Sequence, residues 1–410
     1  MKQRLLFIIS DFYYSNNANS ICVENILNEL KVTYEVDIIT NENINGKMLN
    51  DKEVTLYRGL GLSISEKAIV DRIAHLGRDS SIKKYFLFVV KCLLGIFKLT
   101  IWPEIGILSV PAMTKRALQL IKKNEYIAMI SFAGNVDSHI VALKVKRLRA
   151  VKWIAVSFDP LPNENYIFKN RALFNFKIRR IEKQLFIHAD AMTFPHSLYY
   201  LYLKRAEYVT KKLYLLDFPL YKDIENNISR RKLGTNDSVE LLYMGSLNKK
   251  VRDIEYLFEL FSDFYDKPVT LSVIGDSVLQ NRIDMAIKNY GYLPHEEAIG
   301  IARQENYIGI NIGNNNHYSV PSKIFDYISL KLPIISIEVF RNVPTDYYLE
   351  KYGNYIKIWQ GDSIIHNLEK VRLFINNVHT NINSMKTDEV FKENSPSYIA
   401  KRIDEIMSEI

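Results

Sequence analysis

Short apolar runs alternate with stretches of helical spacing along most of the chain. The first apolar run, Leu5–Ser10, is followed by a polar stretch and then by Ser20–Lys31, in which apolar side chains recur every three or four residues. A second apolar run follows at Val36–Thr40. Strand–helix–strand units of this kind are typical of parallel sheets covered by helices on both faces. The pattern therefore predicts an α/β fold with doubly wound parallel sheets.

The alternation forms two series, separated by a charged, Asn-rich stretch at residues 222–236. The first series ends with a predicted exit strand at Tyr214–Tyr221. Its other expected elements are helices at Met113–Lys123 and Ser138–Arg149 and strands at Ile127–Phe132, Trp153–Ser157 and Ala191–Phe194. The second series is expected to contain strands at Glu240–Met244, Val269–Ile274, Tyr307–Ile312 and Pro333–Ile337, and helices at Ile254–Tyr265, His295–Gln304 and Ser322–Leu330.

The two series predict two Rossmann-like domains, which suits a chain of 410 residues. We expect the first domain to span residues 1–220 and the second to span residues 237–390. The last stretch, Pro396–Ile410, has the spacing of an amphipathic helix. Because such a terminal helix often crosses back in two-domain folds of this type, we assign residues 396–410 to the first domain.

The composition says little about the fold but limits the classes of binding partner. Hydrophobic residues make up 48% and charged residues 24% of the chain, an ordinary balance for a globular protein. The formal net charge of +8 favours polyanionic partners, namely nucleic acid, an anionic membrane surface or phosphate-bearing small molecules. No basic tail, zinc-finger spacing or RNA-binding aromatic motif is present, so we expect no nucleic-acid partner.

Cysteine usage and the first apolar run both favour a cytoplasmic protein. Cys22 and Cys92 have no metal-binding or redox spacing, and each is expected to be a packing residue in a reducing compartment. Leu5–Ile9 is too short for the hydrophobic region of a signal peptide and is better explained as the first strand.

One apolar segment, Tyr85–Trp102, differs from the rest. Its charges are Lys91 and Lys98, with Lys84 just before it. In a helix these lysines would form a narrow basic stripe opposite a broad apolar face, which suits a membrane interface with anionic headgroups and predicts peripheral membrane contact through residues 84–102. The alternative is a helix packed on a sheet with its lysines in solvent. The lysines interrupt the segment too often for a transmembrane span.

The most informative run is Ser319–Ile335, with the sequence SVPSKIFDYISLKLPII. Ser322 is a candidate N-cap for a short helix that is followed by a buried strand. The free N–H groups of the first helical turn, the Ser322 hydroxyl and the Lys323 ammonium can together bind an anion. Asp326, one turn further, can accept hydrogen bonds from a ribose diol. A capped helix before a strand is also common without any ligand, so the pattern alone leaves both interpretations open.

This run resembles the donor-binding segment of GT-B glycosyltransferases, in particular glycosyltransferase family 4, in which a Pro-Ser-Lys-hydrophobic-hydrophobic-acidic-Tyr run precedes a strand. The resemblance implies two Rossmann-like domains that face each other across a cleft. It also implies that Asp326 holds the ribose of a nucleotide sugar, with Ser322 and Lys323 near the pyrophosphate. The family often has a Glu eight residues before the acidic residue, near the donor sugar. Tyr318 occupies that position here, which leaves the identity of the sugar open.

A second stretch, Leu241–Leu257, resembles the segment that opens the second domain in the same family. Its sequence is LLYMGSLNKKVRDIEYL. The resemblance places Gly245 where the backbone approaches the donor. Lys249, Lys250 and Arg252 would supply the positive charge that offsets a leaving diphosphate, which gains charge as the glycosidic bond breaks. The alternative is a solvated basic loop.

In the first domain, the loop after the first strand offers Asn16, Asn17 and Asn19 in place of the Gly-rich loop that many relatives carry. Ligands of open α/β sheets bind at the carboxyl ends of the strands, so these residues are candidates for an acceptor pocket. Residues 138–160 resemble the family's Ser-His-hydrophobic…Trp-Ile…Asp-Pro segment. The resemblance places His139 at the cleft near the donor sugar, where it could move a proton, and Asp159 on the loop after the next strand. The alternative for His139 is a structural role at the start of its helix.

Several motifs of other enzyme classes are missing. The chain has no Asp-x-Asp, HExxH, P-loop or complete G-x-G-x-x-G motif, which disfavours metal-dependent GT-A transferases, zinc proteases, NTPases and dehydrogenases. We therefore expect no metal and no cofactor, with the nucleotide sugar as co-substrate. The family is generally retaining, so the resemblance implies a front-face displacement in which the leaving phosphate helps to deprotonate the acceptor. The candidate catalytic residues for this reaction are His139, Lys250 and Arg252.

The sequence thus predicts a glycosyltransferase that moves a sugar from a nucleotide-sugar donor to a glycan or polyprenyl-linked acceptor. Its expected setting is the biosynthesis of a cell-surface polysaccharide such as capsule or lipopolysaccharide. Two alternatives remain open. A sugar-nucleotide epimerase on the same fold would carry a denser cluster of carboxylates and histidines. A non-catalytic glycosyltransferase-like subunit would bind a partner transferase, and Tyr318 in place of the expected Glu favours it.

Overall fold

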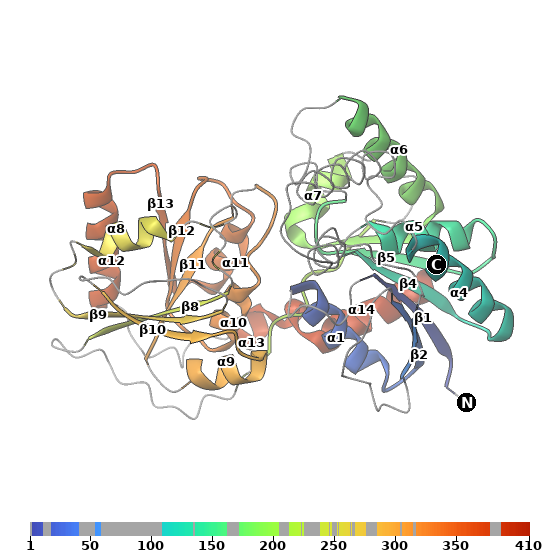
Figure 1. Cartoon of the computed structure of the whole chain (residues 1–410), viewed down its shortest axis with the longest axis horizontal. Helices are drawn as coiled ribbons and strands as arrows, with labels where there is room; N and C mark the ends of the chain where they lie inside the picture. Colours follow the sequence, from blue (N-terminus) through green and yellow to red (C-terminus); the bar gives the residue numbers. More distant parts are fainter. Residues whose placement is uncertain are drawn as a thin grey trace, which may run out of the picture. The chain divides into compact units, whose positions relative to one another are not determined.

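The chain folds into two compact units, one made of residues 1–217 and 400–410 and the other of residues 218–399 (Figure 1). The computed structural model describes residues 2–10, 18–40, 54–58, 109–133, 136–161, 172–204, 213–222, 224, 238–245, 247, 252, 254–262, 264, 267–275, 285–303, 306–314, 317–377 and 387–410. Each unit is built around one parallel sheet, as the alternating pattern predicts. The apolar segment at 84–102 lies outside the described residues, so its predicted membrane contact stays a prediction.

The sheet of the first unit has seven strands in the order β3-β2-β1-β4-β5-β6-β7, with every neighbouring pair parallel. Its strands are β1 (Arg4–Ile9), β2 (Glu35–Thr40), β3 (Val54–Arg58), β4 (Ala128–Ala133), β5 (Trp153–Ser157), β6 (Ala191–Phe194) and β7 (Leu213–Leu215). The helices described in this unit are α1 (Ala18–Leu30), α4 (Ser109–Lys123), α5 (Asp137–Lys146), α6 (Ala172–His188) and α7 (His196–Lys204). The last residues of α14 (Pro396–Glu409) complete it.

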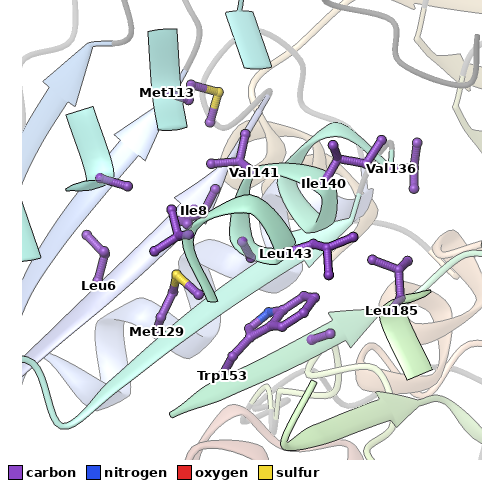
Figure 2. Close-up of a cluster of buried hydrophobic side chains, with 14 of the residues drawn as sticks. Leu6, Ile8, Met113, Met129, Val136, Ile140, Val141, Leu143, Trp153 and Leu185 are labelled. Carbon is purple, nitrogen blue, oxygen red and sulfur yellow. The ribbon is translucent and has the colours of Figure 1, made fainter. Parts of the chain in front are cut away.

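The core of the first unit lies between the sheet and the helices α4 to α7. Strand side chains of alternating register face these helices, because successive residues of a strand point to opposite faces. Figure 2 shows Ile140, Val141 and Leu143 of α5 above the strand residues Met129 and Trp153, all of them buried. α1 lies on the opposite side of the sheet in Figure 1, where its Cys22, Val23, Ile26, Leu27 and Leu30 are buried.

The sheet of the second unit has six parallel strands in the order β10-β9-β8-β11-β12-β13. They are β8 (Val239–Met244), β9 (Val269–Ile274), β10 (Ala286–Gly291), β11 (Ile308–Ile312), β12 (Ile334–Glu338) and β13 (Tyr355–Trp359). Its described helices are α8 (Glu255–Ser262), α9 (His295–Ala302), α10 (Lys323–Ser329), α11 (Thr345–Tyr352), α12 (Ile364–Asn377), α13 (Thr387–Val390) and a 3-10 turn at Lys392–Asn394. α8 and α12 pack on one face of the sheet over a continuous apolar core.

Two features of the chain's path differ in how well they were predicted. The exit strand expected at Tyr214–Tyr221 is wrong in extent, because the strand covers Leu213–Leu215 and the residues after it are irregular and include Pro219. A proline cannot donate to a ladder, which favours an early end. The terminal helix returns to the first unit as predicted. There Asp404 accepts a hydrogen bond from the Tyr34 hydroxyl, and the carbonyl oxygen of Met407 lies 3.3 Å from Nζ of Lys152. None of the described helices is long and apolar enough to cross a membrane.

Candidate functional site: the carboxyl edge of the second sheet

The second sheet changes direction between β8 and β11. From β8 the chain moves outward through β9 to β10, and it then returns to the other side of β8 to form β11, β12 and β13. In open parallel sheets, ligands bind at the carboxyl ends of the strands on either side of such a switch point, because the loops there diverge. The candidate site is therefore the edge where β8 and β11 end. Gly245 and Gly313 are the residues that follow these two strands.

Main chain rather than side chain lines part of this edge. Gly245 and Gly275, which follow β8 and β9, have φ values of +146° and +147°, which side chains rarely adopt. A Cβ atom on Gly275 would lie 2.0 Å from the carbonyl oxygen of Gly245, so the two loops pack backbone against backbone. The predicted role of Gly245, in which a ligand approaches the main chain, stays a prediction.

Arg252 reaches across the ends of both strands. Its Nε atom donates a hydrogen bond to Oδ1 of Asn314 in the loop after β11, at 2.8 Å. Its Nη1 atom lies 3.5 Å from the position that a Cβ of Gly245 would take after β8. Within the described part of the chain, no carboxylate lies at ion-pair distance from this guanidinium group, so its terminal N–H donors remain available to an anion. Lys249 and Lys250, the other predicted cations, lie outside the described residues.

Asp326, on α10, accepts hydrogen bonds from a histidine and a lysine side chain. Its Oδ1 lies 2.9 Å from Nε2 of His295 at the start of α9, and its Oδ2 lies 3.0 Å from Nζ of Lys323. Burial alone would raise the pKa of this carboxyl, but the Lys323 charge and the His295 hydrogen bond outweigh burial and lower the pKa below its ordinary value. Asp326 is therefore ionised at neutral pH, and a carboxylate has further lone pairs for a diol. The contact with His295 was not predicted.

The other predicted donor residues lie around the start of α10. Ser322 is the residue before the helix, as predicted, but its side chain makes no capping hydrogen bond. Lys323, predicted near a pyrophosphate, is paired with Asp326 in this conformation. Tyr318, which stands where the family often has a Glu, is 38% exposed in the preceding loop. The donor-binding roles of these residues stay predictions.

A buried tyrosine beneath this edge was not predicted. The hydroxyl of Tyr327 accepts a hydrogen bond from the backbone N–H of Met244 at 2.9 Å. It also lies 3.2 Å from the carbonyl oxygen of Leu242 and 3.1 Å from that of Ile310. The side chain thus contacts the main chains of both β8 and β11 at the switch point.

A buried carboxyl group at the end of β12 was also missed. Oε1 of Glu338 accepts hydrogen bonds from Oγ of Ser336 at 2.7 Å and from Nδ2 of Asn311 at 3.2 Å. Burial raises the pKa of Glu338 to about 7, although the Ser336 hydrogen bond and the Lys357 charge oppose this. A Cβ on Gly313 would lie 2.0 Å from Oε2 of Glu338, so the carboxyl group supports the main chain at the end of β11. An apolar strand ending in a Glu is the only signal that the sequence offers for it.

In the first unit, the structure brings two predicted residues together. Nδ2 of Asn19 on α1 donates a hydrogen bond to Oδ2 of Asp159, which follows β5, at 2.7 Å. Burial raises the pKa of Asp159, and the Asn19 hydrogen bond opposes that shift. Asn16 and Asn17 lie outside the described residues. Cys22 is a buried free cysteine next to this pair, in agreement with a packing role.

His139 has a fully buried ring whose two nitrogens are both occupied. Nδ1 lies 2.7 Å from Oγ of Ser131 on β4, and Nε2 lies 2.8 Å from Oγ of Ser157 on β5. Nε1 of Trp153 donates to the same Ser131 oxygen at 2.8 Å. Burial lowers the pKa of His139 to about 3, so the ring is neutral. A catalytic role, which stays a prediction, would require one serine to release the ring.

No three His, Cys, Asp or Glu side chains of the described residues come together in a way that could hold a metal ion. Among the described side chains at the edge of the second sheet, Lys323 and His295 are hydrogen-bonded to Asp326, and Arg252 is hydrogen-bonded to Asn314. The arrangement can therefore bind an anion through Arg252 and a hydroxyl-bearing group through Asp326.

Solved structures share this architecture over the whole chain. Sucrose-phosphate synthase from Thermosynechococcus elongatus matches with a TM-score of 0.65 and 12% identity, over 100% of this chain and 99% of the other. HepE (Alr3699) of Anabaena, solved with UDP and glucose, matches with a TM-score of 0.62 and 13% identity over 100% of both chains. WaaG, a glycosyltransferase involved in lipopolysaccharide biosynthesis, matches with a TM-score of 0.59 and 10% identity over 99% of both chains. The chain has the GT-B fold.

The same GT-B fold also serves another activity. UDP-GlcNAc 2-epimerase from Methanocaldococcus jannaschii matches with a TM-score of 0.54 and 13% identity over 100% of both chains. No protein-family model and no curated protein sequence matches the chain. At these identities the likeness concerns the fold, and the chemistry has to be argued from the site.

Proposed function

We propose that the chain is a nucleotide-sugar-dependent glycosyltransferase whose second unit binds the donor. The observation that carries this proposal is the position of Arg252 at the switch point of a GT-B sheet. It is hydrogen-bonded to Asn314, lies close to Gly245, and has no carboxylate at ion-pair distance among the described residues. A diphosphate supplies the missing negative charge, and bidentate N–H donation suits phosphate oxygens.

In the proposed reaction an acceptor hydroxyl oxygen bonds to the anomeric carbon while the bond from that carbon to the diphosphate breaks. The electron pair of the broken bond stays on the diphosphate oxygen, which takes up the acceptor proton, and the nucleoside diphosphate is released. Arg252 and Lys250 stabilise the charge on the departing diphosphate, and Lys249, Ser322 and Lys323 contribute to holding the pyrophosphate. Because the proton transfer occurs on the face from which the diphosphate leaves, the new bond keeps the anomeric configuration of the donor.

Asp326 is the proposed ribose-binding residue. Its ionised carboxylate, fixed by His295 and Lys323, is suited to accept hydrogen bonds from two neighbouring hydroxyls. HepE shares the fold and was solved with UDP and glucose, which supports a nucleoside diphosphate as the ligand of this proposal. The charge on the diphosphate is neutralised by arginine and lysine in this proposal, so no metal is required.

The acceptor is proposed to be a glycan or a polyprenyl-linked glycan, bound by the first unit near Asn19 and Asp159 with Asn16 and Asn17. Asn19 and Asp159 form a hydrogen-bonded pair at the carboxyl edge of the first sheet, where sugar hydroxyls find both donors and acceptors.

A role in cell-surface polysaccharide biosynthesis, at the inner face of the membrane, rests on the lysine-striped segment at 84–102. Failure of the purified protein to co-sediment with anionic vesicles would remove that support.

The test is the thermal stability of the purified protein against UDP-, GDP-, dTDP- and CMP-sugars, with and without EDTA. A ligand that binds only the folded state raises the melting temperature, so we expect one nucleotide class to stabilise the protein equally in both buffers. The Asp326→Ala variant should lose the shift. If no nucleotide stabilises the protein, the non-catalytic partner subunit becomes the better explanation, and Tyr318 in place of Glu then agrees with it.

A sugar-nucleotide epimerase is the second candidate, because an epimerase has the same fold. Incubation with the stabilising nucleotide sugar alone separates the two activities. An epimerase interconverts two nucleotide sugars without an acceptor and releases no free diphosphate product in stoichiometric amount. A transferase consumes the donor only when an acceptor, or slowly water, takes the sugar.

A further inference from the structure

The ladder between β8 and β11 stops before either strand ends. These strands pair at Leu241↔Ile308 and Leu242↔Gly309. By contrast, β8 pairs with β9 through to Met244, and β11 pairs with β12 through to Ile312. The seam at the switch point is therefore open over the last residues of both strands, while the seams on either side of it are closed.

The Tyr327 hydroxyl takes the place of the missing backbone bonds. The N–H of Met244 donates to it, and its own proton faces the carbonyl oxygens of Leu242 and Ile310. The side chain is 1% exposed, and burial raises its pKa above the ordinary value for tyrosine, so the hydroxyl keeps its proton. One hydroxyl thus accepts from the Met244 N–H and donates toward two carbonyl oxygens at a buried seam, where main-chain polar groups need partners.

Gly309 is what allows the ring to stand against β11. A Cβ on Gly309 would lie 2.8 Å from Cγ and 2.9 Å from Cδ2 of the Tyr327 ring. Any other residue on that face of the strand would push the ring away from the seam. Gly309 and Tyr327 therefore act together: the glycine leaves the space that the tyrosine ring occupies, and the tyrosine separates the two strand ends.

We propose that Tyr327 is a positioning residue for the donor diphosphate. Its hydroxyl holds the ends of β8 and β11 apart, and this separation makes room for the diphosphate. This inference rests on the proposed function and identifies how its site is built. Just beyond the separated strands stand Gly245 on one side and Asn314 on the other, and Arg252 reaches between them. Asp326 precedes Tyr327 in α10, so the same anchor fixes the carboxylate proposed for the ribose.

Tyr352 provides a matched control. It is also 1% exposed, and its hydroxyl donates to the carbonyl oxygen of Leu332 at 2.8 Å, before β12 begins and away from the carboxyl edge. Tyr327→Phe and Tyr352→Phe each remove one buried hydroxyl and keep the ring. If Tyr327 serves only to stabilise the fold, the two variants should behave alike.

The experiment measures nucleoside diphosphate affinity by calorimetry and the melting temperature for the wild type and both variants, with the nucleotide identified in the thermal panel. We expect both variants to lose thermal stability. Only Tyr327→Phe should also weaken binding, by about tenfold or more, since small displacements of a binding group have large effects. Equal affinity in the two variants would overturn the proposal.

Hydrogen exchange of the unliganded protein separates this inference from the proposed function. Tyr327→Phe should increase exchange at the amides of Met244 and Gly245 and in the loop after β11, whereas Tyr352→Phe should leave them unchanged. If the wild type binds no nucleotide, the proposed function fails, and the exchange pattern still decides whether Tyr327 organises this edge. Unchanged exchange at Met244 and Gly245 in Tyr327→Phe would refute the positioning role.

Discussion

The two sheets of this protein differ in strand pairing at the same topological position, the switch point between the two central strands. Each sheet reverses direction between two central strands, β1 and β4 in the first unit and β8 and β11 in the second. The β1–β4 seam is paired over five residues up to Ile9↔Phe132, and the next N–H, that of Ser10, donates to Oγ of Ser138 at 2.9 Å. The β8–β11 seam is paired over two residues and then held apart by the Tyr327 hydroxyl.

Topology therefore selects where a ligand can bind in such a sheet, whereas a side chain decides whether the strand ends are separated there. In the first unit, the His139 ring from the helix after β4 is buried between serines of β4 and β5. In the second unit, the helix after β11 sends Tyr327 into the seam itself. The closed seam stabilises its unit, and the open one leaves room at the end of β8 for Arg252.

We expect the strongest destabilisation from a substitution in the first unit, whose central seam is closed. His139→Ala removes a fully buried ring together with its hydrogen bonds to Ser131 and Ser157, although Ser131 keeps its bond from Trp153. The loss should destabilise the first unit by about 3–5 kcal/mol. Urea unfolding followed by pulse proteolysis, with peptides assigned to each unit, measures this loss. Nucleotide affinity of the folded variant should not change. A variant of wild-type stability without transferase activity would instead establish His139 as catalytic and contradict its structural role.

The stability of the two units should depend on pH with opposite signs. His139 sets the dependence in the first unit and Glu338 sets it in the second. The pKa of His139 is lowered from 6.5 to about 3, so the unfolded chain binds a proton that the folded chain refuses, and stability is lost as pH falls below 6.5. The pKa of Glu338 is raised from 4.5 to about 7, so the folded chain keeps a proton that the unfolded chain releases, and stability is lost as pH rises from 4.5 to 7. Each slope is at most about 1.4 kcal/mol per pH unit.

Glu338→Gln keeps the shape of the side chain and removes its titration. Between pH 4.5 and 7, the unfolding free energy of the second unit should become less dependent on pH in this variant, while that of the first unit keeps its slope. The same pulse proteolysis measurement distinguishes the units. Parallel pH profiles for the wild-type and variant second units would show that Glu338 does not titrate in this range.

The third prediction concerns the open seam. Arg252→Ala removes a cation that bonds Asn314 and has no described counter-ion, so nucleoside diphosphate binding should weaken by about 1.5–3 kcal/mol, or about ten- to a hundredfold. Calorimetry with the nucleotide from the thermal panel measures the change. Arg341→Ala is the control, since Arg341 is exposed and paired with Asp362. If the two variants bind the nucleoside diphosphate with equal affinity, the diphosphate does not bind at Arg252.

The smallest effect is expected for a methyl group in the open seam. Gly309→Ala would place a Cβ 2.8 Å from the Tyr327 ring and should destabilise the second unit by about 1–3 kcal/mol through overpacking. Gly300→Ala on α9 meets nothing within 4 Å, and it should stabilise the helix by up to about 1 kcal/mol. Melting temperatures of the two variants should therefore move in opposite directions. A neutral Gly309→Ala would mean that the ring does not need to stand against β11.

The central strands of both sheets were predictable and the edge strands were not. Trp153–Ser157 and Val269–Ile274 were predicted with their observed bounds, because buried parallel strands form continuous apolar runs. The strands β3, β10 and β13 were missed, and β7 was predicted too long, and these four are the edges of the two sheets. β10 is largely exposed, with the sequence AIKNYG, so no apolar run marks it.

The site was predictable where a short motif carries it. Gly245, Arg252 and Asp326 lie in two runs that resemble GT-B donor-binding segments, and the structure places these runs at the carboxyl edge of the second sheet. The hydrogen bond of Asp326 to His295 and the role of Glu338 did not follow, because they depend on contacts between residues far apart in the chain. Tyr327 stands beside Asp326 in the same run, but only the register of β8 against β11 shows where its hydroxyl lies.

The return of the chain through α14 has a consequence for biosynthesis. Residues 400–410 belong to the unit that begins at the N-terminal strand, and the whole second unit is synthesised between its two parts. Domains generally fold as units as they leave the ribosome. The second unit, a continuous segment, has all of its residues available before the first unit does. The unit whose synthesis starts first is therefore the last to be completed, and until then the surface that α14 covers remains open to chaperones.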